Sequence, residues 1–186
     1  INGRRISFPD ENTGYIQSID SGIMKTTDGG ETWTQIVPND GDLNLGFSIY
    51  FANADYGFVG GGGGRISRTN DGGETWTSSH TAIIGDALTV AQPHNAPTYI
   101  GTDTGQIFKS TNGGVSYRDF SPEGFSTINK LIFLNPRVGY ACGEGGLISK
   151  TTDGGRNWEL AETGTSTNIT DLSFVNDDLG FASAFG

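Results

Sequence analysis

The stretch Lys25-Thr-Thr-Asp-Gly-Gly-Glu-Thr-Trp33 occurs four times in this 186-residue sequence, each time with small changes. The other copies are Arg68-Thr-Asn-Asp-Gly-Gly-Glu-Thr-Trp76, Lys109-Ser-Thr-Asn-Gly-Gly-Val-Ser-Tyr117 and Lys150-Thr-Thr-Asp-Gly-Gly-Arg-Asn-Trp158. The central acidic or amide residue recurs after 43, 41 and 41 residues, at Asp28, Asp71, Asn112 and Asp153. A fixed period of this length is the signature of a repeat architecture.

Short apolar segments precede each of these turns and divide every repeat into strand-sized pieces. A Gly-aromatic pair follows the first piece in four of the five repeats, and a third apolar piece leads into the turn. Amphipathic helical periodicity is missing, and four strands in a repeat of this length is the size of one β-propeller blade. We therefore expect an all-β propeller segment of four-stranded antiparallel blades, with the Asp-Gly-Gly hairpin between the third and fourth strands. The first pieces are Ile6-Ser-Phe8, Ile49-Tyr-Phe51, Leu88-Thr-Val90, Leu131-Ile-Phe133 and Leu172-Ser-Phe174.

Each position of the turn phrase has a mechanical role in closing a tight hairpin. An Asp carboxylate, or the amide oxygen of Asn112, accepts hydrogen bonds from backbone N–H groups, and paired glycines allow positive φ. The aromatic residue that follows fills the space beneath the turn. A residue present in every blade cannot converge with its copies on one substrate, so we interpret this set as structural and not catalytic. The set is Thr26, Asp28, Gly30, Trp33, Thr69, Asp71, Gly73, Trp76, Ser110, Asn112, Gly114, Tyr117, Thr151, Asp153, Gly155 and Trp158.

These phrases resemble the Asp-box, or bacterial neuraminidase repeat, of sialidases, xyloglucanases, sortilin-type receptors and many secreted bacterial proteins. The longer phrase Phe8-Pro-Asp-Glu-Asn-Thr-Gly-Tyr15, repeated as Phe174-Val-Asn-Asp-Asp-Leu-Gly-Phe181, is similar to the propeller family of the photosystem II assembly and stability factor. It is also similar to repeats of cell-surface proteins exported by the type IX system of Bacteroidetes. The third repeat departs from this phrase and is closer to the sortilin and xyloglucanase style. The resemblance implies a propeller in an extracytoplasmic location: secreted, periplasmic or at the cell surface.

The spacing also predicts where the repeats begin and end. We assign one propeller domain over residues 1–186, with repeats 6–44, 45–86, 87–127, 128–168 and 169–186. In three repeats the first-strand phenylalanine lies 20 residues before the turn Asp, and the same spacing from Phe174 places a fifth turn beyond Gly186. We therefore expect four full blades and half of a fifth. Another chain, or the remainder of the propeller, is expected to cover the open edge, because uncovered sheet edges promote aggregation.

Acidic residues dominate the charge, with 21 Asp and Glu against 11 Lys and Arg and a formal net charge of −10. This balance lacks the electropositive footprint of nucleic-acid binding. No apolar run approaches the roughly 18 residues of a membrane-spanning helix. The single Cys142 excludes an internal disulfide and is expected to be a buried small apolar residue. We expect no cofactor.

Two groups of charged residues have both a functional and a structural interpretation. A sialidase-like site needs an arginine triad, but most of the arginines fall at turns or rim positions and no triad is identifiable. The cations that open each turn phrase either form a basic arc for an acidic partner or cover a neighbouring strand while their charge reaches water. The second interpretation is preferred because the background is acidic. These cations are Lys25, Arg68, Lys109 and Lys150.

The segment Asp40-Gly-Asp42-Leu-Asn44 resembles the opening of a calcium loop. Such a loop requires a glycine and a glutamate where this sequence has Leu45 and Phe51. A polar connection between blades is therefore the preferred interpretation, and we expect no metal.

Three functional hypotheses remain. The first is a non-catalytic interaction module of an extracytoplasmic or cell-surface protein, holding a protein or glycan partner. The second is an assembly factor for a photosynthetic complex. The third is a glycoside hydrolase of sialidase or xyloglucanase type, which is disfavoured because a partial propeller cannot assemble a central site alone. In the first hypothesis specificity lies in the loops that differ between repeats, namely Pro38–Leu45, Ser78–Asp86, Gln92–Thr98 and Ser121–Asn129.

Overall fold

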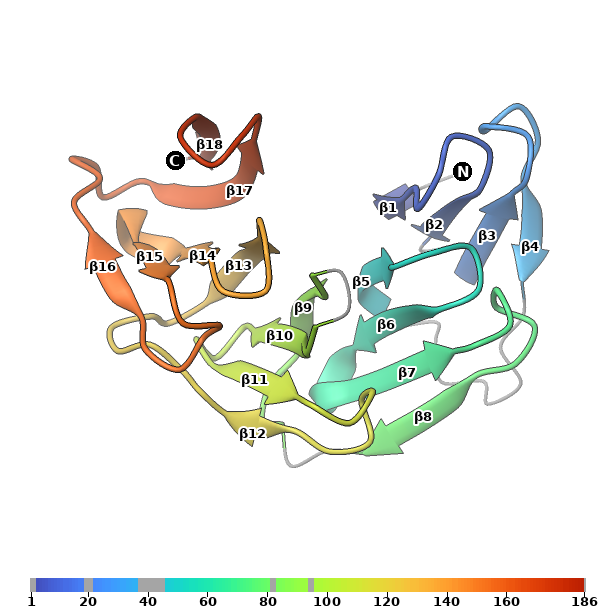
Figure 1. The fold of residues 1–186 in the computed structure, drawn as a ribbon, viewed down its shortest axis with the longest axis horizontal. Coiled ribbons are helices and arrows are strands. Elements are labelled where there is room, and N and C mark those ends of the chain that lie inside the picture. The colour runs from blue at the N-terminus through green and yellow to red at the C-terminus, as the bar shows by residue number, and fades with distance from the viewer. Residues whose placement is uncertain (1–2, 19–21, 37–45, 81–82, 94–95, 186) are drawn as a thin grey trace. The chain divides into compact units, whose positions relative to one another are not determined.

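The structure is a computed structural model and describes residues 3–18, 22–36, 46–80, 83–93 and 96–185. Four sheets have four antiparallel strands each and a fifth has two, which confirms the predicted fold class (Figure 1). Each four-stranded sheet keeps its strands in chain order, with the glycine turn between the third and fourth strands. Short 3-10 turns at Gly62–Gly64 and Glu144–Gly146 are the helical elements of the described chain.

The strands of the five sheets are coloured from blue to red along the chain in Figure 1. The first two sheets contain β1 (Gly3–Ser7), β2 (Gly14–Ser18), β3 (Gly22–Thr26), β4 (Thr34–Ile36), β5 (Gly46–Phe51), β6 (Gly57–Gly61), β7 (Arg65–Thr69) and β8 (Thr77–His80). The third and fourth contain β9 (Ala87–Ala91), β10 (Thr98–Thr102), β11 (Ile107–Ser110), β12 (Arg118–Asp119), β13 (Ile128–Phe133), β14 (Gly139–Gly143), β15 (Ile148–Thr151) and β16 (Glu159–Ala161). The fifth contains β17 (Asn168–Phe174) and β18 (Gly180–Phe185).

The chain divides into two compact units, residues 1–90 and 91–186, and the division falls within β9. In the first unit a core cluster joins Tyr15 and Ile23 of the first blade to Ile49, Phe51 and other residues of the second. In the second unit, Tyr99 and Ile107 pack with residues of β13 and β14. Each core is therefore built between neighbouring blades, as expected for a stack of repeats that cannot bury an apolar face alone.

The Gly-aromatic pair has a steric explanation. Phe51 pairs with Gly57 across β5 and β6, and a Cβ on Gly57 would lie 2.5 Å from the phenylalanine ring. The glycine is therefore required because the ring lies directly over its backbone. The first, fourth and fifth blades have the same close approach.

The third blade replaces both members of this pair. Gln92, and not Val90, lies 20 residues before the turn residue Asn112, and Thr98 takes the place of the glycine. Gln92 and Thr98 line a pocket of about 210 Å³, and the Gln92 amide donates a hydrogen bond to the Ala96 carbonyl. Without the phenylalanine ring a side chain fits at position 98, which explains why the third repeat departs in both places.

A second recurring contact joins consecutive blades and occurs once within each of the two units. In the second unit, the Tyr99 hydroxyl and the Lys109 ammonium both donate to the Gly154 carbonyl, at 2.8 and 2.7 Å. The Tyr99 ring also stacks on Phe133 of the next blade, with 4.0 Å between ring centroids. Tyr99, Lys109 and the turn glycine thus form one latch between the third and fourth blades.

The first unit has the same latch. Lys25 donates to the Gly72 carbonyl at 3.0 Å, and the Tyr15 ring stacks on Phe51. The Tyr15 hydroxyl donates to the Ala54 carbonyl of the second blade at 2.6 Å and lies 3.3 Å from the Gly72 carbonyl. The ammonium groups at this position therefore bond the neighbouring turn, a role that neither sequence-based interpretation included.

The fifth sheet exposes apolar side chains. Phe181 of β18 occupies the position of the stacking tyrosines and is 62% exposed, and Phe185 is 79% exposed. Its inner side packs on the fourth blade through Ile169, Leu172 and the buried Cys142. No helix among the described residues is long and apolar enough to cross a membrane.

Candidate functional site

The predicted structural set lies at the four glycine turns, and the second turn illustrates its geometry. The Thr69 hydroxyl donates to Asp71 at 2.8 Å and accepts from the Gly73 N–H at 2.9 Å. Asp71 also accepts from the backbone N–H and the hydroxyl of Thr75, and these bonds, led by the hydroxyl, lower its pKa to about 2. The Trp76 indole donates to the Gly73 carbonyl at 3.1 Å. The carboxylate oxygens are therefore engaged within their own turn.

The other turns repeat this pattern with two departures. Asn112 accepts from Ser110 and from the Ser116 N–H, and its own amide nitrogen donates to the Ser116 hydroxyl at 2.9 Å. At the fourth turn, the buried Trp158 Nε1 has no hydrogen-bond partner among the described residues, whereas Trp33 bonds its turn like Trp76. Both departures lie in the second unit, and Trp158 lines a pocket there.

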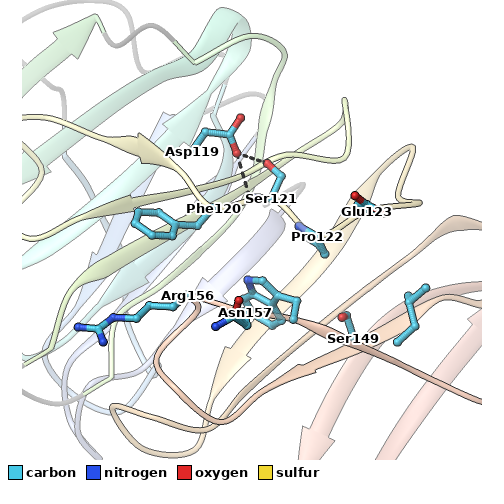
Figure 2. Close-up of a pocket in the computed structure, with 10 residues that line it drawn as sticks. Asp119, Phe120, Ser121, Pro122, Glu123, Ser149, Arg156 and Asn157 are labelled. Carbon is cyan, nitrogen blue, oxygen red and sulfur yellow. Dashed lines mark hydrogen bonds between the residues drawn. The ribbon is translucent and has the colours of Figure 1, made fainter.

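That pocket is a groove of about 610 Å³ between the outer strands of the third and fourth blades. We call it the β12–β16 groove, and it is lined by residues 119–123, 149, 156–158 and 160. Figure 2 shows Asp119 and Ser121 joined by hydrogen bonds on one side, with Arg156, Asn157 and Ser149 on the other. The lining combines aromatic, apolar and charged side chains.

A repeat-to-repeat comparison shows how the groove arises. In the second blade Ser67 pairs with Ser78 across β7 and β8, and their hydroxyls are 2.6 Å apart. In the fourth blade the equivalent pair is Ser149 and Leu160. Ser149 is fully buried with no hydrogen-bond partner for its hydroxyl among the described residues, while Leu160 is 56% exposed. A hydroxyl that stabilises the second blade is thus replaced by an exposed apolar side chain in the groove.

Both strands that border the groove are sheet edges. β12 and β16 are each the last strand of their sheet, and Asp119 and Leu160 extend from them into the lining. An edge strand presents backbone N–H and C=O groups that can pair with an added strand. The groove therefore lies beside two strands of the kind to which an added strand can pair.

The other sequence-predicted candidates lie elsewhere. Residues 40–45, the candidate calcium loop, and the Pro38–Leu45 loop fall outside the described residues. No group of three or more His, Cys, Asp or Glu residues able to hold a metal occurs in the described ranges. Of the variable loops, Ser121–Asn129 contributes residues to the groove.

Arg118 and Arg156 line one pocket beside the groove, although the sequence placed most of the arginines only at turns or rim positions and identified no cluster of them. The sequence signal that could have pointed to this pocket is that both arginines differ from the residues at the same positions in the other repeats.

The sheets and their interlocking turns define a β-propeller assembled from glycine-turn repeats. A model of the family described as photosynthesis system II assembly factor YCF48 matches residues 4–132. The match covers more than half of the sequence, and the chain belongs to this family. No curated protein sequence matches it significantly.

Solved structures of related architecture agree with this fold. YCF48 bound to a D1 peptide is 19% identical, with a TM-score of 0.57, covering 95% of this chain and 74% of that one. The GH74 xyloglucanase of Xanthomonas campestris is 14% identical, with a TM-score of 0.80, covering 98% of this chain and 33% of that one. The WD40 propeller domain of Doa1 is 12% identical, with a TM-score of 0.72, covering 98% and 62%. At these identities the likeness shows the fold alone.

Proposed function

We propose that this chain is a non-catalytic interaction module that holds an extended segment of a protein partner in the β12–β16 groove. The observation that carries the proposal is that two sheet edges flank a groove in which Leu160 replaces a structural serine. Peptides commonly bind by adding a strand to a sheet edge, with neighbouring pockets selecting their side chains. Asp119, Glu123 and Arg156 supply charges that set the register of such a segment.

Family membership supports the same class of function. The related YCF48 structure holds a D1 peptide, which makes an assembly-factor role with a protein ligand the preferred form of the proposal. The resemblance to exported cell-surface repeats supports an extracytoplasmic location. Protease accessibility on intact source cells tests that location.

The central experiment replaces Leu160 by the residue found at the same place in the second blade. Leu160→Ser gives Ser149 a hydroxyl partner, so the free energy of unfolding is expected to stay constant or rise by up to about 1 kcal/mol. It also removes apolar contact area, so affinity for a fluorescein-labelled D1 peptide is expected to fall about tenfold in fluorescence anisotropy. The matched control is Leu179→Ser, which changes an exposed leucine outside the groove.

Two results would contradict the proposal. One is equal peptide affinity for Leu160→Ser and the unchanged chain. The other is failure of both the D1 peptide and a phage-displayed random peptide library to bind. Release of reducing ends from xyloglucan would instead favour the hydrolase hypothesis over a non-catalytic module.

A further inference from the structure

A second pocket, of about 390 Å³, adjoins the groove and shares Phe120 and Arg156 with it. We call it the cationic pocket, because Lys109, Arg118 and Arg156 all line it. Three cations around one small pocket are unexpected in a chain whose formal net charge is −10. All of its lining residues belong to the second unit.

Comparison with the first two repeats shows that several residues of the pocket differ from their counterparts, and that each of these differences makes the charge more positive. By position in the repeat, Lys109 corresponds to Lys25, Asn112 to Asp28, Arg118 to Thr34, and Arg156 to Glu74. The earlier set contains one cation and two carboxylates, whereas the pocket contains three cations and no carboxylate. Turn mechanics do not require these changes, because the earlier repeats form the same turns without them.

The two arginines of the pocket have no salt bridge to a protein carboxylate. Neither Arg118 nor Arg156 forms an ion pair within residues 96–185. The pKa of Lys109 is lowered, first by burial and then by the positive charge of Arg156, while Asp153 opposes the shift. Like charges therefore act on one another across the pocket.

The neighbouring carboxylates are engaged by other donors. Asp153 accepts from the backbone N–H groups of Arg156 and Asn157 and from the Asn157 amide nitrogen. Asp119 accepts from the N–H and hydroxyl of Ser121 and from the Gln106 amide. Neither carboxylate lines the cationic pocket.

We propose that the cationic pocket binds a tetrahedral oxyanion group, phosphate or sulfate. Three cations match a dianion better than a single carboxylate, and guanidinium groups form charge-assisted hydrogen bonds to phosphate oxygens. The Ser116 hydroxyl adds a neutral donor, and Phe120 closes one side beneath the Lys109 ammonium, 5.5 Å from the ring centroid. The inference does not depend on the proposed peptide groove, because a free inorganic ion suffices to test it.

The experiment is a titration of the ¹⁵N-labelled chain with inorganic phosphate, at neutral pH and constant ionic strength, followed by amide chemical shifts. Saturable shifts are expected at Asn112, Ser116, Arg118 and Arg156, with a dissociation constant on the order of 1 mM. Arg118→Thr and Asn112→Asp restore residues that the other repeats carry, so the fold is expected to persist. Each is expected to weaken phosphate binding about tenfold.

The control and the competing ions complete the test. Arg137→Glu reverses an exposed arginine that does not line the pocket and is expected to leave phosphate affinity within twofold, about the level of long-range screening. Sulfate is expected to compete with phosphate for the pocket, and acetate is expected to bind more weakly. A titration with phenyl phosphate shows whether an esterified phosphate is preferred over the free ion. The proposal is overturned by shifts that do not saturate, by equal responses to phosphate and acetate, or by unchanged affinity in Arg118→Thr. Because Asn112→Asp alters no lining residue of the groove, loss of phosphate binding with intact D1 peptide binding separates this inference from the proposed function.

Discussion

At the scale of single residues, two recurring positions are explained by hydrogen bonds to one glycine carbonyl in the turn of the next blade. The tyrosine of the second strand and the lysine that opens the turn phrase both reach this carbonyl, as Tyr99 and Lys109 do at Gly154. These two hydrogen bonds hold the turn of the next blade in a fixed position relative to the tyrosine and the lysine. This is why a tyrosine hydroxyl and an ammonium recur at fixed distances in the sequence although neither belongs to a catalytic group.

Tyr99→Phe tests the latch. Lys109 still bonds the Gly154 carbonyl in the variant, so the loss of stability is expected to be only about 1 kcal/mol at neutral pH. Burial, followed by the charge of Asp153, raises the pKa of Tyr99 from 10.0 to about 12. The folded state therefore holds this proton more tightly than the unfolded state, and the contribution is complete below pH 10 and lost as pH rises through 12.

Urea unfolding of wild type and Tyr99→Phe at several alkaline pH values checks this expectation. The difference in unfolding free energy between the two proteins should shrink from pH 10 upward. A difference that stays constant to pH 12 would show that the hydroxyl is not buried as described.

Asp71→Asn tests the turn carboxylate. The pKa of Asp71 is lowered from 3.8 to about 2 by the Thr75 hydroxyl, the Thr75 N–H and the Thr69 hydroxyl. Because the folded-state pKa is depressed, the stabilisation is present above pH 3.8 and is lost as pH falls through 2. The variant is therefore expected to melt at a lower temperature than wild type at neutral pH and at the same temperature near pH 2. Circular dichroism melts measure both, and Asn112→Asp should show the opposite pH trend, since it adds the same carboxylate to the third turn.

At the scale of elements, the first two strands of a blade fit together because a phenylalanine ring on the first strand lies over a glycine on the second. Phe133 lies over Gly139, stacks on Tyr99 and meets Trp158 edge-on, so one ring connects two blades and a turn. The third blade abandons the phenylalanine and the glycine together. Because both positions change in the same blade, we infer that the steric contact between the two residues couples them, and not the strand propensity of each residue alone.

The pair Gln92→Phe and Thr98→Gly measures this coupling. Gln92→Phe alone is expected to destabilise the chain, because the new ring meets the Thr98 Cβ where the other blades have none. Thr98→Gly alone loses stability through backbone entropy and an enlarged cavity. The double variant is expected to regain at least about 1 kcal/mol relative to the sum of the single changes in urea unfolding. Strictly additive effects would refute the steric coupling.

At the scale of the whole molecule, the sequence predicted the fold because each structural constraint is repeated several times. Turn, glycine and aromatic positions recur at one period, so strand order and hairpin position followed from spacing alone. The candidate sites, in contrast, consist of residues that are not repeated. Leu160, Arg118 and Arg156 are departures from the repeat, and only the structure shows that they meet at the same blade junction. Spacing along the chain carries no information on which departures meet in space.

Stability is expected to vary along the chain, and Cys142 reports on its C-terminal part. The thiol is fully buried, and burial followed by the charge of Asp171 raises its pKa to about 12. Its cover consists of Ile169 and Leu172 of a two-stranded sheet whose outer strand, β18, is exposed along its length. Reaction with a thiol reagent should therefore be blocked in the native state and proceed through local opening of β17 and β18. The opening free energy from labelling rates is expected to be smaller than the unfolding free energy from tryptophan fluorescence. Equal values would show that the last sheet opens only when the fourth blade unfolds, and immediate labelling would contradict the burial of the thiol.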